Sequence, residues 1–228
     1  MKRYFLAVTL FLLASFDSSY AMASNRSDFE IKSLKSEESV SYSVKVAFTK
    51  GNILHINTGV AVVIMATEDE CILVTAKHLV QNVSSVRVLP LVREWDGQME
   101  IEARVSYIDS LDDVAFLSFT TNHKYVAPNI VLDENVMIGK SVVAFKYLPG
   151  NGYQVARGHI IGFWQLPDNK KFMVAKMSIE EGFSGSGLFD DAGNLVGLVS
   201  GRNMDKRFEV AYIVSGPKIV AALRRFYK

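Results

Sequence analysis

Two serines in a glycine-rich loop are the residues of this chain whose surroundings most clearly suggest covalent chemistry. Residues 180–201 read EEGFSGSGLFDDAGNLVGLVSG, so Ser184 and Ser186 alternate with glycines just before a strand-like run. A serine acts as a nucleophile when a base removes its proton, an acid orients that base, and donors stabilise the oxyanion. The rest of the chain must therefore supply a histidine and a carboxylate.

Chain order decides which folds could supply these partners. The four histidines are His55, His78, His123 and His159. All of them precede Ser184, which excludes the α/β-hydrolase class, because that class places its acid and histidine after the serine. His78 follows an apolar run in ILVTAKHLV, and Asp113 directly precedes the apolar run VAFLSF. The order histidine, aspartate, serine is that of the chymotrypsin class.

The elements that must position these residues are expected to be strands. Short runs rich in Val, Ile, Phe and Tyr, such as TGVAVVIM, CILVTA, SVVAFKYL and NLVGLVS, are separated by turn sequences such as PGNG and DAGN. Residues 216–228, GPKIVAALRRFYK, instead have helical spacing, with Ile219, Leu223 and Phe226 on one face. The pattern predicts an all-β protein with one C-terminal helix, a sandwich or a pair of barrels, divided near residues 120–135.

Taken in order, these segments resemble the trypsin-like (chymotrypsin-fold) serine peptidases, in particular the bacterial HtrA/DegP-like or glutamyl-endopeptidase-like branch. TGVAVVIM and CILVTAKHLV resemble the Gly-rich strand and T-A-x-H motif of that family, and DSLDDVAFLSF resembles its D-[IVL]-A-x-L acid motif. GFSGSGLFD resembles the G-x-S-G-[GS] nucleophile loop, and NLVGLVSG resembles the substrate-binding strand after it. The resemblance covers the chain from about residue 41 to its last residue.

The resemblance implies two antiparallel six-stranded β-barrels with the active site between them, and a role for each matching residue. Ser184 is the expected nucleophile, His78 the base, and Asp113 the acid that orients the base. The backbone N–H groups of Gly182 and Ser184 are the expected oxyanion hole. The residues expected to bind substrate are Ser178, Ile179 and Ser200. Ser186 is expected to be a small residue that lets the loop turn.

Other residues compete for the roles of acid and base. Asp109 and Asp112 are alternatives to Asp113, but alternation along a strand would turn Asp112 away from Asp113, and the motif favours Asp113. The remaining histidines are expected away from the chemistry: His55 in a strand near the cleft, His123 in a solvated loop, and His159 at the surface or a strand edge.

Phe183 departs from the family pattern, because relatives commonly carry Asp or Asn at this position. In zymogen-type members an Asp there pairs with a newly freed N-terminus, which Phe183 cannot do, so we expect no such activation step. Two arrangements remain open: Phe183 packs inward and holds the oxyanion loop, or it leaves the loop collapsed without substrate. Ser178 and Ile179 offer no acid for a basic side chain, which favours a small or apolar residue on the acyl side of the cleaved bond.

The N-terminal residues predict export. A basic start and the apolar run at residues 4–16 precede small residues at Ala21 and Ala23, which is typical of a signal peptide at residues 1–23. Residues 24–40 are polar and are expected to form a flexible N-terminal segment before a peptidase domain at 41–228. We place the first barrel at about 41–125 and the second at about 126–228, and expect no PDZ domain.

Composition argues against several other classes of function. The chain of 228 residues has 25 Lys+Arg against 24 Asp+Glu, a balance that argues against general binding to nucleic acid or acidic membranes. No later segment is long and apolar enough to act as a membrane anchor once the signal is cleaved. Cys71 is the single cysteine, so no internal disulfide is possible, and no Cys/His spacing suggests a metal or other cofactor.

The sequence thus predicts an exported serine endopeptidase, periplasmic or secreted, that hydrolyses protein or peptide substrates through an acyl-enzyme intermediate. Two alternatives stay open. The fold could carry a non-catalytic or partner-activated protein-binding module, for which Phe183 is the main support. An esterase or acyl-transfer activity would use the same constellation of residues.

Overall fold

The computed structural model describes residues 41–50, 53–83, 85–90, 100–121, 125–148, 152–166, 170–203 and 209–228. The expected signal peptide, the N-terminal segment to residue 40, and His123 lie outside the described residues. The helices of the described part of the chain all lack the length and apolar composition needed to cross a membrane.

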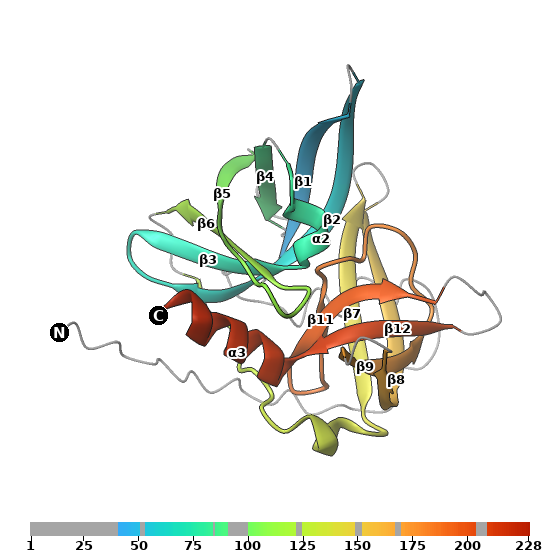
Figure 1. Cartoon of the computed structure of the whole chain (residues 1–228). Coiled ribbons are helices and arrows are strands. Elements are labelled where there is room, and N and C mark those ends of the chain that lie inside the picture. Colours follow the sequence, from blue (N-terminus) through green and yellow to red (C-terminus); the bar gives the residue numbers. More distant parts are fainter. Residues whose placement is uncertain are drawn as a thin grey trace. The chain divides into compact units, whose positions relative to one another are not determined.

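Two closed antiparallel barrels of six strands each form the protein, which confirms the predicted fold class (Figure 1). The first has the strand order β1-β2-β3-β6-β5-β4, and the second has the order β10-β11-β12-β9-β8-β7. The first barrel contains β1 (Ser41–Lys50), β2 (Ile53–Ala66), β3 (Glu70–Thr75), β4 (Ser85–Pro90), β5 (Ile101–Ile108) and β6 (Ala115–Thr120). The second contains β7 (Ser141–Leu148), β8 (Gly152–Gln165), β9 (Lys171–Met177), β10 (Gly187–Phe189), β11 (Leu195–Arg202) and β12 (Val210–Ser215).

Two short helical turns and a C-terminal helix accompany the strands in the described ranges. The helical turn α2 (Lys77–Val80) follows β3, and the 3₁₀ turn η1 (Glu134–Met137) lies between the two sets of strands. The C-terminal helix α3 (Gly216–Phe226) follows β12 directly, with Pro217 in its first turn, as the sequence predicts. Ile219 is buried, and Leu223 and Phe226 pack against a core formed with both barrels.

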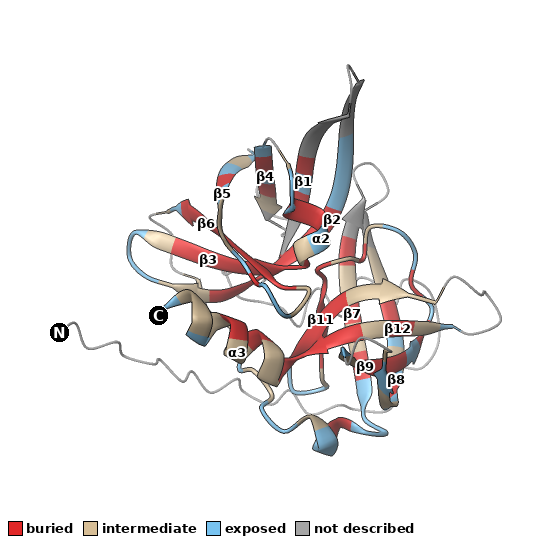
Figure 2. Ribbon diagram, in the orientation of Figure 1, coloured by how far each residue is buried: buried red, intermediate tan, exposed pale blue. Residues whose placement is uncertain are grey.

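Residues 60–64 of β2, 71–74 of β3 and 115–117 of β6 are buried and apolar on both faces, because they lie between two cores (Figure 2). In β3, Leu73 packs inside the first barrel, whereas Ile72 and Val74 belong to a core shared with the second barrel and α3. Residues alternate sides along a strand, so a segment that lies between two cores is apolar at successive positions. This explains the unbroken apolar runs of the sequence.

Candidate active site

His78 and Asp113 lie side by side at the ends of neighbouring strands. β3 pairs with β6 so that Thr75 faces Ala115, which brings the residues after β3 next to those before β6. The ring Nδ1 of His78 lies 2.8 Å from Oδ2 of Asp113, and the backbone N–H of His78 donates to Oδ1 at 2.9 Å. His78 belongs to the helical turn α2 and is exposed, so its ring remains accessible.

Asp113 lies in a turn organised by Asp109. The carboxylate of Asp109 accepts the N–H groups of Leu111 at 3.0 Å and Asp112 at 2.7 Å, while its own N–H donates to the carbonyl of Val114. These bonds fold residues 109–114 into a compact bend. The expected alternation between Asp112 and Asp113 does not apply, because both lie in this bend and not in a strand.

Asp109 and Asp112 pair with helix α3 and not with His78. Asp109 is fully buried, and Arg225 donates to it from Nε at 2.7 Å and from a terminal nitrogen at 2.9 Å. Asp112 accepts from Lys218 at 2.8 Å. Burial alone would raise the pKa of the Asp109 carboxyl, but the Arg225 guanidinium and the backbone donors outweigh it and hold that pKa below its ordinary value.

Ser200 also contacts the Asp113 carboxylate. Its hydroxyl donates to Oδ2 of Asp113 at 2.5 Å, across the two barrels. The register between β11 and β12 shifts between Val199 and Gly201, and such an irregularity re-aims the side chain at that point. Burial would raise the pKa of the Asp113 carboxyl, but hydrogen bonds from His78 and Ser200 outweigh it and lower that pKa. Asp113 is therefore ionised at neutral pH, and because a carboxylate can only accept, Nδ1 of His78 is the donor in this pair.

The loop of Ser184 is attached to the first barrel beside the turn that carries His78. The N–H of Val60 in β2 donates to the carbonyl of Ser184 at 2.9 Å, and Gly185 donates to the carbonyl of Val199 at 2.8 Å. Gly185 has φ of +79°, and a Cβ added there would lie 2.1 Å from the Val60 carbonyl and 2.4 Å from Oγ1 of Thr75. Only glycine allows this approach, which places the backbone of Ser184 close to the end of β3.

The expected oxyanion donors are not used by the fold. The N–H groups of Gly182 and Ser184 have no acceptor among the described residues. Gly182 has φ of +88°, a conformation that side chains rarely adopt. In the same part of the chain no hydrogen bond joins Oγ of Ser184 to His78, and catalytic hydrogen bonds of this kind often tighten only when substrate binds.

Ser186 has a structural environment. Its side chain is buried, and its hydroxyl donates to the carbonyl of Phe145 at 2.6 Å and accepts the Phe145 N–H at 3.2 Å. A hydroxyl held by both backbone groups of one strand residue is not free to attack a substrate. Of the two serines, Ser184 is thus the one whose hydroxyl is not held by the backbone of Phe145.

Phe183 packs inward, which is the first of the two arrangements left open by the sequence. Its side chain is 3% exposed and belongs to the core of the second barrel. Ile179 is also buried in that core, whereas Ser178 is exposed. A pocket of about 260 Å³ lies against Phe183, and its other lining residues are Gln154, Val155, Ala156, Ser178 and Glu180.

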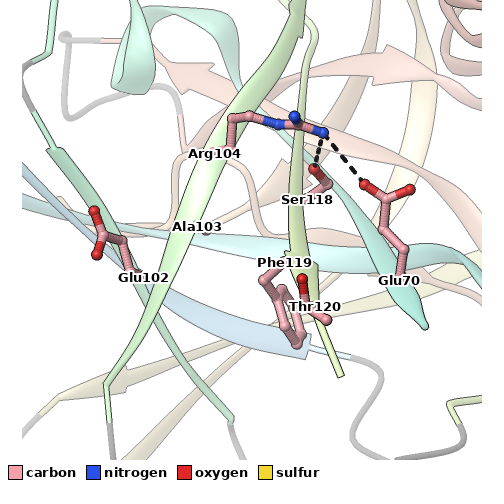
Figure 3. Close-up of a pocket in the computed structure, with 7 residues that line it drawn as sticks. All are labelled: Glu70, Glu102, Ala103, Arg104, Ser118, Phe119 and Thr120. Atoms are coloured by element: carbon pink, nitrogen blue, oxygen red, sulfur yellow. Dashed lines mark hydrogen bonds and ion pairs between the residues drawn. The ribbon is translucent and has the colours of Figure 1, made fainter. Parts of the chain in front are cut away.

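A larger pocket, of about 550 Å³, lies on the first barrel and holds none of the predicted site residues (Figure 3). Arg104 extends across it to Glu70 and Ser118, at 3.5 and 3.3 Å. The predicted catalytic residues instead lie around His78, where a paired imidazole, a carboxylate and the Ser184 loop come together. Among the other histidines, His159 is exposed in β8 and His55 lies in β2.

Lys146 lies near the loop and was not predicted from the sequence. Val142, Ala144 and Lys146 occupy alternate positions of β7, and all three are buried. The sequence pattern could have indicated it, because a lysine at the same alternate positions of a strand as inward-facing apolar residues must find partners inside the barrel. Its ammonium donates to the carbonyl of Glu181 at 2.6 Å, in the loop before Ser184.

Two six-stranded barrels, with a histidine–carboxylate pair between them beside a glycine-rich serine loop, define a chymotrypsin-fold peptidase. The model of the trypsin-like peptidase domain matches residues 58–198, more than half of the chain. The protein belongs to this family.

Solved structures of proteases share the fold. The active form of the Rv3671c protease from M. tuberculosis is 20% identical, with a TM-score of 0.68, over 83% of this chain and 81% of that one. The HtrA-type protease AlgW with a tripeptide is 19% identical, with a TM-score of 0.68, over 83% of this chain and 60% of that one. These likenesses concern the fold.

A curated relative is similar in sequence. The uncharacterized protein y4bJ of Sinorhizobium fredii (strain NBRC 101917 / NGR234) is 25% identical over 134 residues, which cover 57% of this chain. The chain spans about a fifth of the length of that relative.

Proposed function

We propose that the protein is an exported serine endopeptidase that hydrolyses peptide bonds through an acyl-enzyme intermediate on Ser184. The observation that carries the proposal is the pairing of His78 with Asp113 beside the Ser184 loop. The family supports a peptidase, and the structures of AlgW with peptides support a peptide as the class of substrate.

In the proposed first half-reaction, Oγ of Ser184 attacks the carbonyl carbon and His78 Nε2 takes its proton. The negative charge on Asp113 stabilises the imidazolium, and the carbonyl oxygen, now an oxyanion, accepts from the N–H groups of Gly182 and Ser184. His78 then gives its proton to the leaving amine, and the C–N bond breaks to leave an ester on Ser184. In the second half-reaction water attacks this ester with His78 as base, which releases the acid and restores Ser184.

Labelling with a fluorophosphonate tests the nucleophile. The wild-type protein should form a covalent adduct, Ser184→Ala should not, and Ser186→Ala should retain labelling after circular dichroism has shown that it is folded. A folded wild type without labelling contradicts the proposal and favours the alternative of a protein-binding module. Internal cleavage of a denatured protein substrate, read by mass spectrometry, distinguishes an endopeptidase from an esterase.

The export part of the proposal is supported by the apolar run at residues 4–16 and the small residues at Ala21 and Ala23. Expression of the full chain in a bacterium, followed by fractionation and N-terminal analysis of the product, tests it. A product that starts after Ala21 or Ala23 outside the cytoplasm supports export. An uncleaved product in the cytoplasm contradicts it.

A further inference from the structure

Lys146 places a positive charge inside the second barrel. Its side chain is 3% exposed. Ala144, two positions earlier in β7, and Phe183, whose ring contacts the ammonium, both belong to the core of that barrel. An ammonium removed from water is costly unless hydrogen bonds and opposite charge satisfy it. The contacts of this lysine therefore indicate which part of the structure it stabilises.

In the described part of the chain, the hydrogen bond, ion pair and ring contact of the Lys146 ammonium all involve residues 180–183, the loop that precedes Ser184. Nζ donates to the carbonyl of Glu181 at 2.6 Å and lies 3.7 Å from a carboxylate oxygen of Glu180. It also lies 4.8 Å from the centre of the Phe183 ring, within the range of a cation–π contact. One side chain of β7 thereby contacts three residues of this loop.

The contact with Glu181 determines the direction of the Gly182 N–H. The peptide between Glu181 and Gly182 is trans, so its C=O and N–H point in opposite directions. With the carbonyl held toward the buried ammonium, the N–H must point away from it, where no described residue accepts it. If this peptide flipped, the Glu181 carbonyl would point to the side on which the Gly182 N–H is now available as a donor.

We propose that Lys146 is a positioning residue that holds the Glu181–Gly182 peptide in the orientation in which the Gly182 N–H serves as an oxyanion donor. This inference rests on the proposed function, because it assigns Lys146 to the oxyanion site of Ser184. Phe183 contributes by packing its ring against the ammonium, so the apolar residue that departs from the family pattern stabilises the loop. Lys146 contacts no substrate and acts through the backbone of Glu181.

The substitution Lys146→Met should remove the ammonium and leave the fold intact. It keeps a long apolar side chain inside the barrel, and it leaves no buried unpaired carboxylate, since the Glu180 side chain is 73% exposed. Lys171→Met is a matched control, because Lys171 lies in β9 of the same barrel, 3.8 Å from the centre of the Phe163 ring, and pairs with Glu134 instead of the loop. Lys146→Arg restores a cationic donor.

The first experiment compares these three variants with the wild type in peptide hydrolysis and fluorophosphonate labelling. Loss of one oxyanion donor lowers kcat by about 100-fold or more. Lys146→Met should therefore lose about 100-fold in kcat and in labelling rate, with KM within about twofold of wild type, and Lys146→Arg should recover part of the loss. Lys171→Met should match the wild type. Equal kcat in Lys146→Met and Lys171→Met, or a change confined to KM, would overturn the inference.

A second experiment separates this inference from the proposed function. Crystal structures of the wild type and Lys146→Met, determined without inhibitor, should show the Gly182 N–H free in the first and the Glu181–Gly182 peptide turned over in the second. If the wild type fails to label, the proposed function fails, and the two crystal structures still decide whether Lys146 sets the peptide orientation. An unchanged peptide in Lys146→Met overturns the inference even if the wild type is active.

Discussion

His78 and Asp113 are joined through both the backbone and the side chain of the histidine. The His78 N–H donates to one carboxylate oxygen at 2.9 Å, while ring Nδ1 lies 2.8 Å from the other. The two bonds fix the α2 turn to the bend before β6, so the ring cannot rotate away without breaking a contact with a charged group. With Nδ1 bonded to Asp113, Nε2 is the ring nitrogen that would accept a proton in the proposed reaction.

Asp113→Asn should reduce the rate of fluorophosphonate labelling by about 10⁴-fold, because an amide favours the wrong tautomer of His78. Asp112→Asn is the matched control, since Asp112 lies next in the same bend but pairs with Lys218. It should change the labelling rate by no more than a few-fold. Similar losses in the two variants would mean that the labelling rate depends on the structure of the bend and not on the charge at position 113.

Ser200→Ala distinguishes two roles for a residue that the sequence assigns to substrate binding. In the structure its hydroxyl donates to the Asp113 carboxylate, and a hydrogen bond to a charged group contributes about 1.5–3 kcal/mol. If this is its role, kcat should fall by about 10- to 100-fold with KM little changed, measured on a peptide substrate. A rise in KM at constant kcat would instead assign Ser200 to substrate binding.

Much of the site was predictable because its motifs are short and occur in a characteristic order. Strands buried on both faces produce apolar runs, and chain order distinguishes one triad class from another. The pair of barrels and the roles of His78 and Asp113 were what the resemblance to the trypsin-like peptidases implied. The directions of side chains were harder to predict from the sequence. Ser200 turns toward Asp113 at an irregularity between β11 and β12, and no residue pattern within β11 indicates where such a shift falls.

Long-range pairs outside the family motifs could not be predicted from one sequence. Arg225 and Asp109 are 116 residues apart, and no pattern in either segment indicates that the two residues pair. Lys146 and Glu181 are 35 residues apart, and the contact uses a backbone carbonyl, which every residue has. The inward register of Lys146 in β7 did indicate that some acceptor must exist, but only the folded loop shows which one.

Gly185→Ala should destabilise the protein through both strain and collision. At φ of +79° the alanine costs about 1–3 kcal/mol, and its Cβ would also meet the Val60 carbonyl at 2.1 Å. Gly193→Ala is the control for strain alone, because Gly193 has φ of +77° and nothing within 4 Å of the added Cβ. Urea unfolding should show a loss of about 1 kcal/mol for Gly193→Ala and about 3 kcal/mol or more for Gly185→Ala. Equal losses would show that the serine loop is free to move away from β2.

Arg225→Met should destabilise the protein in a pH-dependent way, whereas Arg224→Met should not, because Arg224 is exposed and has no partner among the described residues. Removing one member of a buried pair costs about 3–5 kcal/mol, and Asp109 is fully buried.

The sign of the pH dependence follows from the lowered pKa of Asp109 in the folded protein. A carboxyl with a depressed pKa stabilises the fold above its ordinary pKa of about 4, and this contribution is lost as the pH falls through the folded pKa. The difference in unfolding free energy between wild type and Arg225→Met should therefore be largest near neutral pH and should shrink in acid, as read from urea unfolding at a series of pH values. Arg225→Met should also label more slowly than Arg224→Met, since Asp109 organises the bend that carries Asp113. A difference that stays constant from neutral to acid pH would show that Arg225 contributes packing and not charge.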